Sequence, residues 1–452
     1  MHQLAKCFSC QKRKTSKTLL VAAGALAVTA GAWWACSQFH KTVDGNEITA
    51  NILGTFNLLL HEIFIGNEAA AVSIIQQHPE VVRACRSFDK VTAAAVAAQH
   101  GQAEVLQALL QLGADVDAIS AAGYSLLCFA ASAGHARCAE LLLHAGARVQ
   151  PLAGSSGHSA LHLAAFNGHA HVVRVFVRQA GCNLRVGQQS NRGQSALMLA
   201  AAQGHLSCVR ELLLAGGSCQ QKDTAGYTAL HHAVTSGDQQ VLVAVMAASA
   251  PPACCPAAAA PSVLALAAAR GDVESFICLV HGGWSVLGRT RSPLTAYAPQ
   301  WCTPLHVAAA TGHSSLLHAL SATADDIAAG NDPGINFISA VNENSGYRQV
   351  LDAQGWSPAA VAASTGARST LRELVLQDSD ALKFKGLSGE TLVHIASRSE
   401  AGVAVLADLH AYGCPFDQVD FQGCTPLHYA HLANCEEAIA VLVLLGSKPG
   451  CK

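Results

Sequence analysis

The stretch Thr303-Pro304-Leu305-His306-Val307-Ala308-Ala309 decides the fold of this 452-residue chain. A second copy begins at Thr425, and near-copies begin at Ser159 and Thr228. Aligned on the Thr or Ser of this motif, the chain shows gaps of 33, 34, 36, 33, 34, 41, 54, 34 and 34 residues. The anchors are Thr92, Ser125, Ser159, Ser195, Thr228, Ser262, Thr303, Ser357, Thr391 and Thr425. Because seven of the nine gaps lie between 33 and 36, the chain is interpreted as an array of one repeated unit.

Each position of the motif has a physical role that predicts a pair of helices. The side-chain oxygen of the Thr or Ser accepts a free backbone N–H at the start of the first helix. Pro304 sits at the first helical position, where a missing N–H costs little, and a glycine such as Gly312 suits the left-handed residue after a helix end. Leucine runs such as 212–214 predict the second helix. One unit cannot bury its apolar face alone, so stacking of units stabilises the fold.

The pattern Thr-Pro-Leu-His-x-Ala-Ala, followed by Gly-His, resembles the repeats of the ankyrin-repeat family over roughly residues 55 to 447. The resemblance implies an all-α solenoid of about ten to eleven helix-turn-helix repeats with hairpin-like loops. A weaker copy around Leu60-His61 and Gly66-Asn67 predicts an N-terminal capping repeat. We divide the chain into a basic tail (1–17), an apolar segment (18–39), a linker (40–54) and the repeat array (55–450).

Three insertions interrupt the predicted array, near residues 248–261, 282–300 and 321–350. The first is rich in proline and alanine and replaces a normal end of a second helix. In repeat proteins such insertions map to loops on one face, which is often the binding face.

Residues 18–39 run for 22 residues without a charge, which is about the length that spans a bilayer. With the basic cluster before them, they predict one N-terminal transmembrane helix, and hence a single-pass membrane protein tethered through residues 18–39. The small residues Ala30-Gly31-Ala32 leave a cleaved signal peptide open, which would make the protein secreted, and an organelle-targeting segment is a third interpretation. Cys7 and Cys10 are candidates for lipidation, with unmodified thiols as the alternative.

The side of the membrane on which the repeats would lie stays open. The basic flank places the N-terminus on the cytoplasmic side and sends the repeats across. The 17 scattered cysteines and the lack of any Asn-x-Ser/Thr triplet instead favour a reducing, unglycosylated setting. An anchor of the outer-mitochondrial type, with the repeats in the cytosol, would satisfy both observations.

Composition and motifs exclude several classes of function. A net charge of −2 with 13% charged residues offers no basic face for nucleic acid. The histidines follow the motif Leu or the turn Gly of the repeat, so we interpret them as structural and not as metal ligands. They are His162, His231, His306, His394 and His428 in the first set and His135, His169, His205 and His313 in the second. Because no phosphate loop, nucleophile elbow or other catalytic constellation is found, we expect no enzyme, cofactor or metal.

The residue just before each capping Thr or Ser is expected near the concave surface through which ankyrin arrays usually bind. Tyr124, Tyr227 and Trp356 occupy this position, and such residue types are enriched among binding hot spots. Packing on the adjacent loop is the alternative use. We expect a monomeric interaction scaffold, membrane-tethered through its N-terminus, whose partner is another protein that the sequence does not name. The alternative is a secreted effector of a host-associated microbe with a cleaved N-terminal signal.

Overall fold

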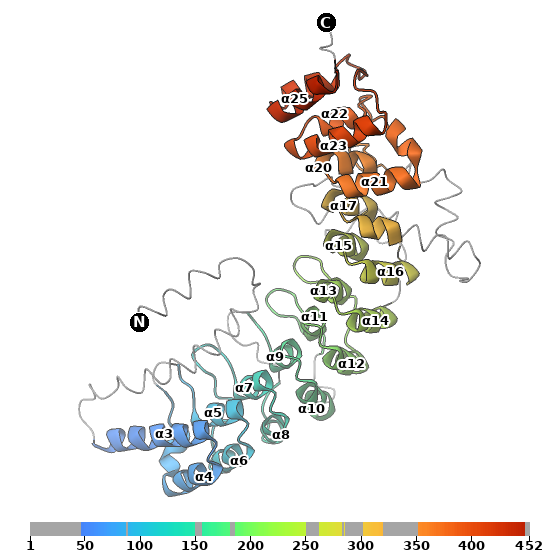
Figure 1. Ribbon diagram of the computed structural model, residues 1–452. Helices are drawn as coiled ribbons and strands as arrows, with labels where there is room; N and C mark the ends of the chain where they lie inside the picture. Colours follow the sequence, from blue (N-terminus) through green and yellow to red (C-terminus); the bar gives the residue numbers. More distant parts are fainter. Residues whose placement is uncertain are drawn as a thin grey trace.

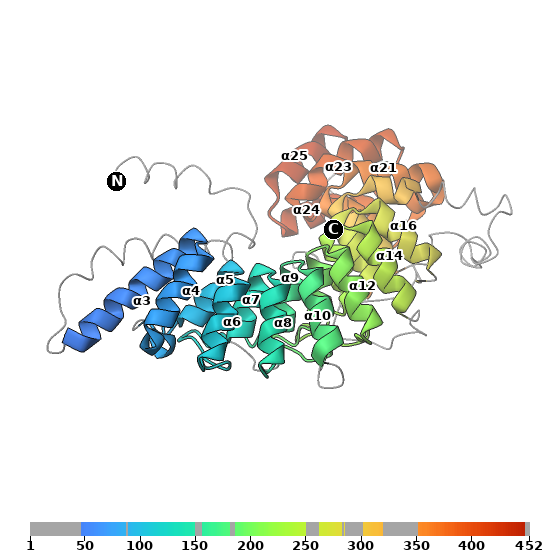
Figure 2. The ribbon, with the colours of Figure 1, turned by 90° about the horizontal axis from the view of Figure 1, so that it is seen from below.

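The chain folds into a curved stack of antiparallel helix pairs (Figures 1 and 2). The computed structural model describes residues 47–86, 89–149, 156–180, 186–249, 262–282, 284, 302–319 and 351–447. In these residues the β-structure consists of isolated bridges at the bases of loops, Cys85–Thr92, Ile119–Ser125 and Gln189–Ser195. The predicted all-α solenoid with hairpin-like loops is therefore confirmed.

Two rows of helices run along the stack, and each repeat contributes one helix to each row. The first helices are α3 (Glu47–Ile65), α5 (Ala93–His100), α7 (Leu126–Ala133), α9 (Ala160–Phe166), α11 (Ala196–Ala202), α13 (Ala229–Ser236), α15 (Val263–Arg270), α17 (Pro304–Thr311), α20 (Pro358–Thr365), α22 (Leu392–Ala396) and α24 (Pro426–Leu432). The second helices are α4 (Glu68–Gln77), α6 (Ala103–Gln111), α8 (Ala136–His144), α10 (Ala170–Ala180), α12 (Leu206–Leu214), α14 (Gln239–Ala248), α16 (Val273–His281), residues 314–319, α21 (Arg368–Gln377), α23 (Glu400–Ala411) and α25 (Glu436–Leu444). The short 3-10 helices η1 (Pro79–Arg83) and η4 (Ser379–Lys383) follow α4 and α21.

Local sequence signals begin and end the first helices as predicted. The Ser125 hydroxyl accepts the N–H of Cys128 at 3.4 Å, and the Ser262 hydroxyl accepts the N–H of Ala265 at 3.1 Å. Helix α7 ends at Gly134, whose φ of 86° is left-handed and is easily adopted only by glycine. These signals are local, which explains why the helix boundaries follow from the motif.

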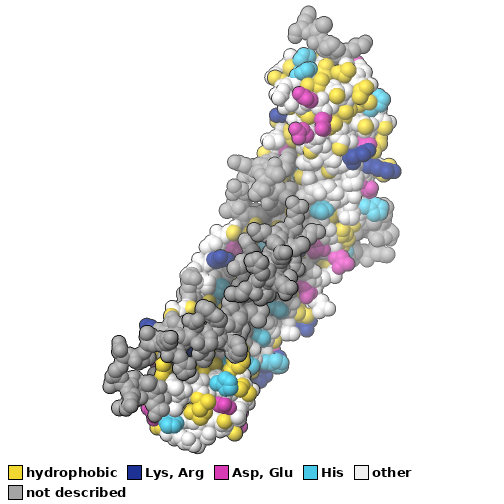
Figure 3. All heavy atoms as spheres, turned by 60° about the vertical axis from the view of Figure 1, so that its left-hand side comes forward, with side chains coloured by type: hydrophobic (Ala, Val, Ile, Leu, Met, Phe, Trp, Pro, Cys, Tyr) yellow, Lys and Arg dark blue, Asp and Glu magenta, His cyan; other side chains and the backbone are white. Residues whose placement is uncertain are grey.

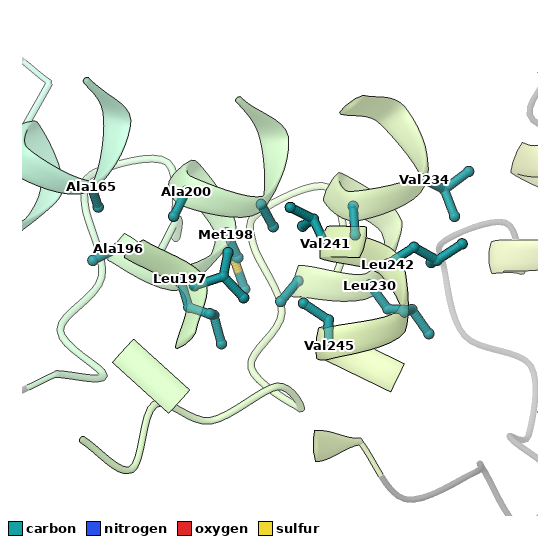
Figure 4. Packing of buried hydrophobic residues seen from close by; sticks show 14 of the residues in the cluster. Ala165, Ala196, Leu197, Met198, Ala200, Leu230, Val234, Val241, Leu242 and Val245 are labelled. Carbon is teal, nitrogen blue, oxygen red and sulfur yellow. The ribbon is translucent and has the colours of Figure 1, made fainter. Parts of the chain in front are cut away.

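Small residues let neighbouring repeats approach closely. Ala196, Ala200 and Ala201 of α11 are fully buried, and α11 packs against α9 and α13. Branched side chains of the second row, such as Val241 and Leu242 of α14, fill the layer behind them (Figure 4). A helix of seven or eight residues is too short to be stable alone in water. Burial of each leucine contributes about 1.5–3 kcal/mol, so the stacked interfaces stabilise the array.

The N-terminal repeat is the predicted capping repeat. Helix α3 is 19 residues long and packs on α4 and α5. The chain turns at Gly66, and the Asn67 side chain accepts the N–H of Ala70 at 3.3 Å to cap α4. The weak copy in the sequence therefore folds as the first repeat of the described stack.

The prediction of a transmembrane helix, and with it of a single-pass membrane protein, is corrected by the structure. No helix in the described ranges is both long and apolar enough to cross a membrane. Helix α3 carries polar side chains along its length, and α23 with 12 residues rises only about 18 Å against a hydrocarbon core of about 30 Å. Residues 18–39, Cys7 and Cys10, on which this prediction and that of lipidation rested, lie outside the described residues.

The stack continues across the three predicted insertions. Residues 248–261, 282–300 and 321–350 lie almost entirely outside the described residues. The repeats on either side of each insertion still meet, because α13 packs on α15, α15 on α17 and α17 on α20. The first helices therefore form one continuous row on the inner side of the bend (Figure 1).

Candidate protein-binding surface

In three repeats the motif histidine joins its own repeat to the next hairpin loop. His162 Nδ1 accepts the backbone N–H of Ser159 at 3.2 Å, and its Nε2 lies 3.0 Å from the Gln194 carbonyl oxygen. A backbone N–H can only donate, so Nδ1 carries no proton and Nε2 donates to the carbonyl. His306 and His394 repeat this arrangement, with Nε2 distances of 2.9 and 3.1 Å to the carbonyls of Trp356 and Cys424.

Burial favours the neutral form of the His162 and His394 imidazoles. His162 is 1% exposed, and burial lowers its pKa to about 4. Burial likewise lowers the pKa of His394, against the opposing effect of its bond to the Cys424 carbonyl. His162, His306 and His394 thus have the structural role that the sequence predicts, as bonds between neighbouring repeats.

The second set of histidines bonds in the opposite direction, to the preceding repeat. His169 Nε2 lies 3.1 Å from the Ser132 carbonyl oxygen, and His205 Nε2 lies 3.1 Å from that of Phe166. The His169 ring covers Gly134, where an added Cβ would lie 2.6 Å from Nδ1. Repeats with both histidines are thus tied to both neighbours, which stiffens the inner row of loops and helices.

We call the position before the capping Thr or Ser the slot, and in several hairpins its backbone N–H donates to a side chain four residues earlier. The Tyr124 N–H donates to the Ser120 hydroxyl at 3.1 Å. The Tyr227 N–H donates to Asp223 Oδ1 at 2.8 Å, and the Trp356 N–H donates to Asp352 at 2.9 Å. The backbone at the slot is therefore fixed before any partner binds.

The three predicted binding residues lie in separate hairpins and do not form one cluster. Tyr124 is half-buried, with its ring edge-on to Phe129 at 6.3 Å between centroids. The Tyr227 ring lies 5.3 Å from the ring of His231 in its own repeat. Trp356 is half-buried against the core. No intramolecular hydrogen bond of the Tyr124 or Tyr227 hydroxyl is found in the described part of the chain, and their role in binding stays a prediction.

The inner helices add side chains to this surface that the sequence analysis missed. They occur four residues after the capping Thr or Ser and are half-buried on the open side of the first helices. They are Phe129, Leu163, His232, Leu266 and Tyr429. The sequence alone does not separate them from residues at the same offset that are buried, which are Val96, Leu199, Val307, Val361 and Ile395.

Cysteine and histidine side chains do not assemble into a metal site in the described ranges, where no three His, Cys, Asp or Glu side chains are grouped to hold an ion. Burial raises the pKa of the Cys138 and Cys208 thiols to about 11. These thiols pack as small apolar side chains between repeats.

Comparison with known proteins identifies the repeat. The family model described as ankyrin repeats (3 copies) matches residues 50–153, 94–188, 161–250 and 359–452. A protein of Oryza sativa subsp. japonica named "Probable E3 ubiquitin-protein ligase XBOS31" is 31% identical over 116 residues, which is 26% of this chain and 26% of that protein. A protein of Arabidopsis thaliana named "E3 ubiquitin-protein ligase KEG" is 26% identical over 200 residues, which is 44% of this chain and 9% of that protein. The chain thus spans about a quarter of the first relative and under a tenth of the second. Because the family model matches well over half of the residues, the chain belongs to the ankyrin-repeat family.

Proposed function

We propose that this protein is an interaction scaffold that binds another protein through the slot residues and the inner helices. The observation that carries the proposal is the slot itself. In three hairpins the slot residue is aromatic, and its backbone N–H is hydrogen-bonded to the side chain of Ser120, Asp223 or Asp352. A pre-ordered aromatic side chain loses little entropy on binding, which makes it a suitable anchor for a partner.

The neighbouring side chains support this role. The hydroxyls of Tyr124 and Tyr227 are available to a partner's hydrogen-bonding groups. Phe129 and His232 extend the same face with half-buried rings. Such a mixture of aromatic surface and polar groups is typical of the centre of a protein interface.

The two relatives are named as ubiquitin ligases, but the aligned region in each is a small part of the protein. For this chain we propose only that its ankyrin repeats bind another protein. Ligase chemistry is not proposed.

Affinity capture with the full chain, followed by mass spectrometry, tests the proposal. We expect Tyr227→Ala together with Trp356→Ala to reduce the captured partner at least about tenfold, since hot-spot truncations cost 2 kcal/mol or more. Tyr227→Phe keeps the ring and shows whether the hydroxyl takes part. Leu214→Ala is the matched control, because this side chain is 84% exposed at the end of α12 in the other row. Capture of the same proteins in the same amounts by the double variant would rule out the slot residues as the binding surface.

A further inference from the structure

One position at the hairpin tips carries a large, exposed apolar side chain in the last two hairpins. It lies three residues before the slot and is small or polar in the described hairpins of the N-terminal and middle repeats, namely Ala121, Asn191, Thr224 and Ala353. In the last two hairpins it is Leu387 and Phe421, which are 72% and 79% exposed. Hydrophobic side chains gather on the surface of the C-terminal repeats in Figure 3. Large exposed apolar side chains on adjacent repeats mark an interaction surface more often than single ones do.

Both side chains are supported from below. An added Cβ at Gly355 would lie 2.5 Å from Leu387 Cγ, and one at Gly389 would lie 2.8 Å from Phe421 Cδ1. The Phe421 N–H also donates to the Ser388 carbonyl at 3.0 Å, which joins the two hairpins. Leu387 and Phe421 therefore rest on the glycine of the preceding hairpin and keep their outer faces in water.

The residues two positions earlier extend this surface. Lys385 lies two residues before Leu387, and Val419 lies two residues before Phe421. Gly386 and Asp420, between them, are buried, whereas Val419 is 57% exposed and Lys385 is exposed. We call Lys385, Leu387, Val419 and Phe421 the tip patch.

The charged side chains around the tip patch differ in whether they are paired. Lys383 forms an ion pair with Asp380 at 2.8 Å, but Lys385 takes part in none of the ion pairs of the described residues. The Asp420 carboxylate is buried and accepts the N–H groups of Gln422 and Cys424. A cavity of about 280 Å³ opens beside Lys385, lined also by Phe384, Leu392, Pro415 and Gln418.

We propose that the tip patch docks an extended segment of a partner protein in which an apolar side chain is flanked by a carboxylate. The apolar group would contact Leu387 and Phe421, and the carboxylate would pair with Lys385. A second copy of this chain fits less well, because an isologous contact would pair the tip patch with itself, and the patch holds no carboxylate to pair with Lys385. This inference rests on the proposed function in one respect, that the ligand is a protein. The tip patch and the slot residues consist of different side chains.

Two pools of synthetic decapeptides test the proposal. The pools are matched in Leu and Phe content and carry either Glu or Lys at their other positions. With the full-length chain in fluorescence anisotropy, we expect the acidic pool to bind and the basic pool to bind at least about tenfold more weakly. Leu387→Ser and Phe421→Ser should each weaken the acidic pool at least about tenfold, whereas Leu214→Ser, at an equally exposed leucine, should not change it. Lys385→Glu should reverse the preference, a gain that an unfolded variant cannot produce.

Three results would overturn the tip patch. The first two are absence of binding to either pool and equal binding of both pools. The third is self-association of the chain in sedimentation equilibrium that Phe421→Ser abolishes, because this result would assign the surface to a second copy. The proposed function is tested separately by the double variant Tyr227→Ala with Trp356→Ala. A negative result for the tip patch therefore does not contradict the proposed function, and a negative result for the slot residues does not contradict the tip patch.

Discussion

The Tyr429 hydroxyl donates a 2.8 Å hydrogen bond to Asp420 Oδ2, nine residues earlier in the chain. His232 Nε2 lies 3.0 Å from Asp223 Oδ2 across the same separation. In both repeats one carboxylate oxygen orders the hairpin backbone and the other is held by the first helix. Burial alone would raise the pKa of Asp420, but the hydrogen bonds from Cys424, Tyr429 and Gln422 outweigh burial and hold this pKa below its usual value. The hairpin loop is thus fixed to the first helix of its own repeat.

Removal of the Tyr429 hydroxyl should loosen the last hairpin. Asp420 is only 5% exposed, so Tyr429→Phe leaves a buried carboxylate oxygen without this donor. We expect a loss of about 1–3 kcal/mol in the free energy of unfolding, measured by urea denaturation. Tyr124→Phe is the matched control, because this hydroxyl has no hydrogen bond in the described residues and its loss should change stability by less than about 0.5 kcal/mol. Equal losses in the two variants would contradict the role of the Tyr429–Asp420 bond.

The close contact of His169 with Gly134 predicts a coupled pair of substitutions. Gly113 and Gly134 both have a left-handed backbone, with φ of 81° and 86°, but nothing lies within 4 Å of a Cβ added at Gly113. Gly113→Ala should cost about 1 kcal/mol from backbone strain alone. Gly134→Ala should cost about 1–2 kcal/mol more, because the His169 ring must move away from the Ser132 carbonyl.

A double-mutant cycle separates strain from contact in this pair. Combined with His169→Ala, Gly134→Ala should cost no more than Gly113→Ala does in the same background. If the extra cost of Gly134→Ala persists without the imidazole, the contact with His169 is not its cause.

Stability should fall as the pH falls from 6.5 to 4. The pKa of His162 is about 4 in the folded state against 6.5 when unfolded, so the unfolded chain binds more protons in this window. The stabilising contribution is complete above pH 6.5 and is lost as the pH approaches 4, by on the order of 3 kcal/mol. His162→Gln should therefore be less stable at pH 7 but show a weaker dependence on pH in chemical denaturation between pH 4 and 6.5. His171→Gln, at an exposed position of α10, is the control; an unchanged pH profile in His162→Gln would exclude His162 as a source of acid sensitivity.

The buried cysteines should resist alkylation until the repeats unfold. Cys138 and Cys208 are fully buried, with a pKa of about 11, whereas Cys85 is exposed. The thiolate is the reactive form, so iodoacetamide at pH 8 should modify Cys85 within minutes and leave the other two unmodified. Peptide mass spectrometry measures the extent of alkylation at each cysteine. In urea, which unfolds the repeats, the three cysteines should be alkylated at similar rates. Native modification of Cys138 as fast as that of Cys85 would contradict the packing of α8.

The local signals in the motif were sufficient to predict the repeats and their helices. The hydroxyl of Ser125 caps α7, and Gly134 ends it, through interactions within a few residues of each other. The predicted number of about ten to eleven repeats agrees with the eleven first helices of the described residues. The weak copy before Thr92 was recognisable for the same reason, since Gly66 and Asn67 act within their own turn. The predicted membrane helix did not have such support, because it rested on hydropathy and flanking charge alone.

The sequence by itself determined the unit, its period and its caps, because these depend on contacts between near neighbours in the chain. Only the tertiary structure decided which histidines bond forward to the next hairpin and which bond backward, as with His162 to Gln194 and His169 to Ser132. It also decided that Leu387 and Phe421 remain exposed while resting on the glycine of the preceding hairpin. These contacts join residues some 30 or more positions apart, and their geometry is set by how one repeat stacks on the next, which no single motif encodes.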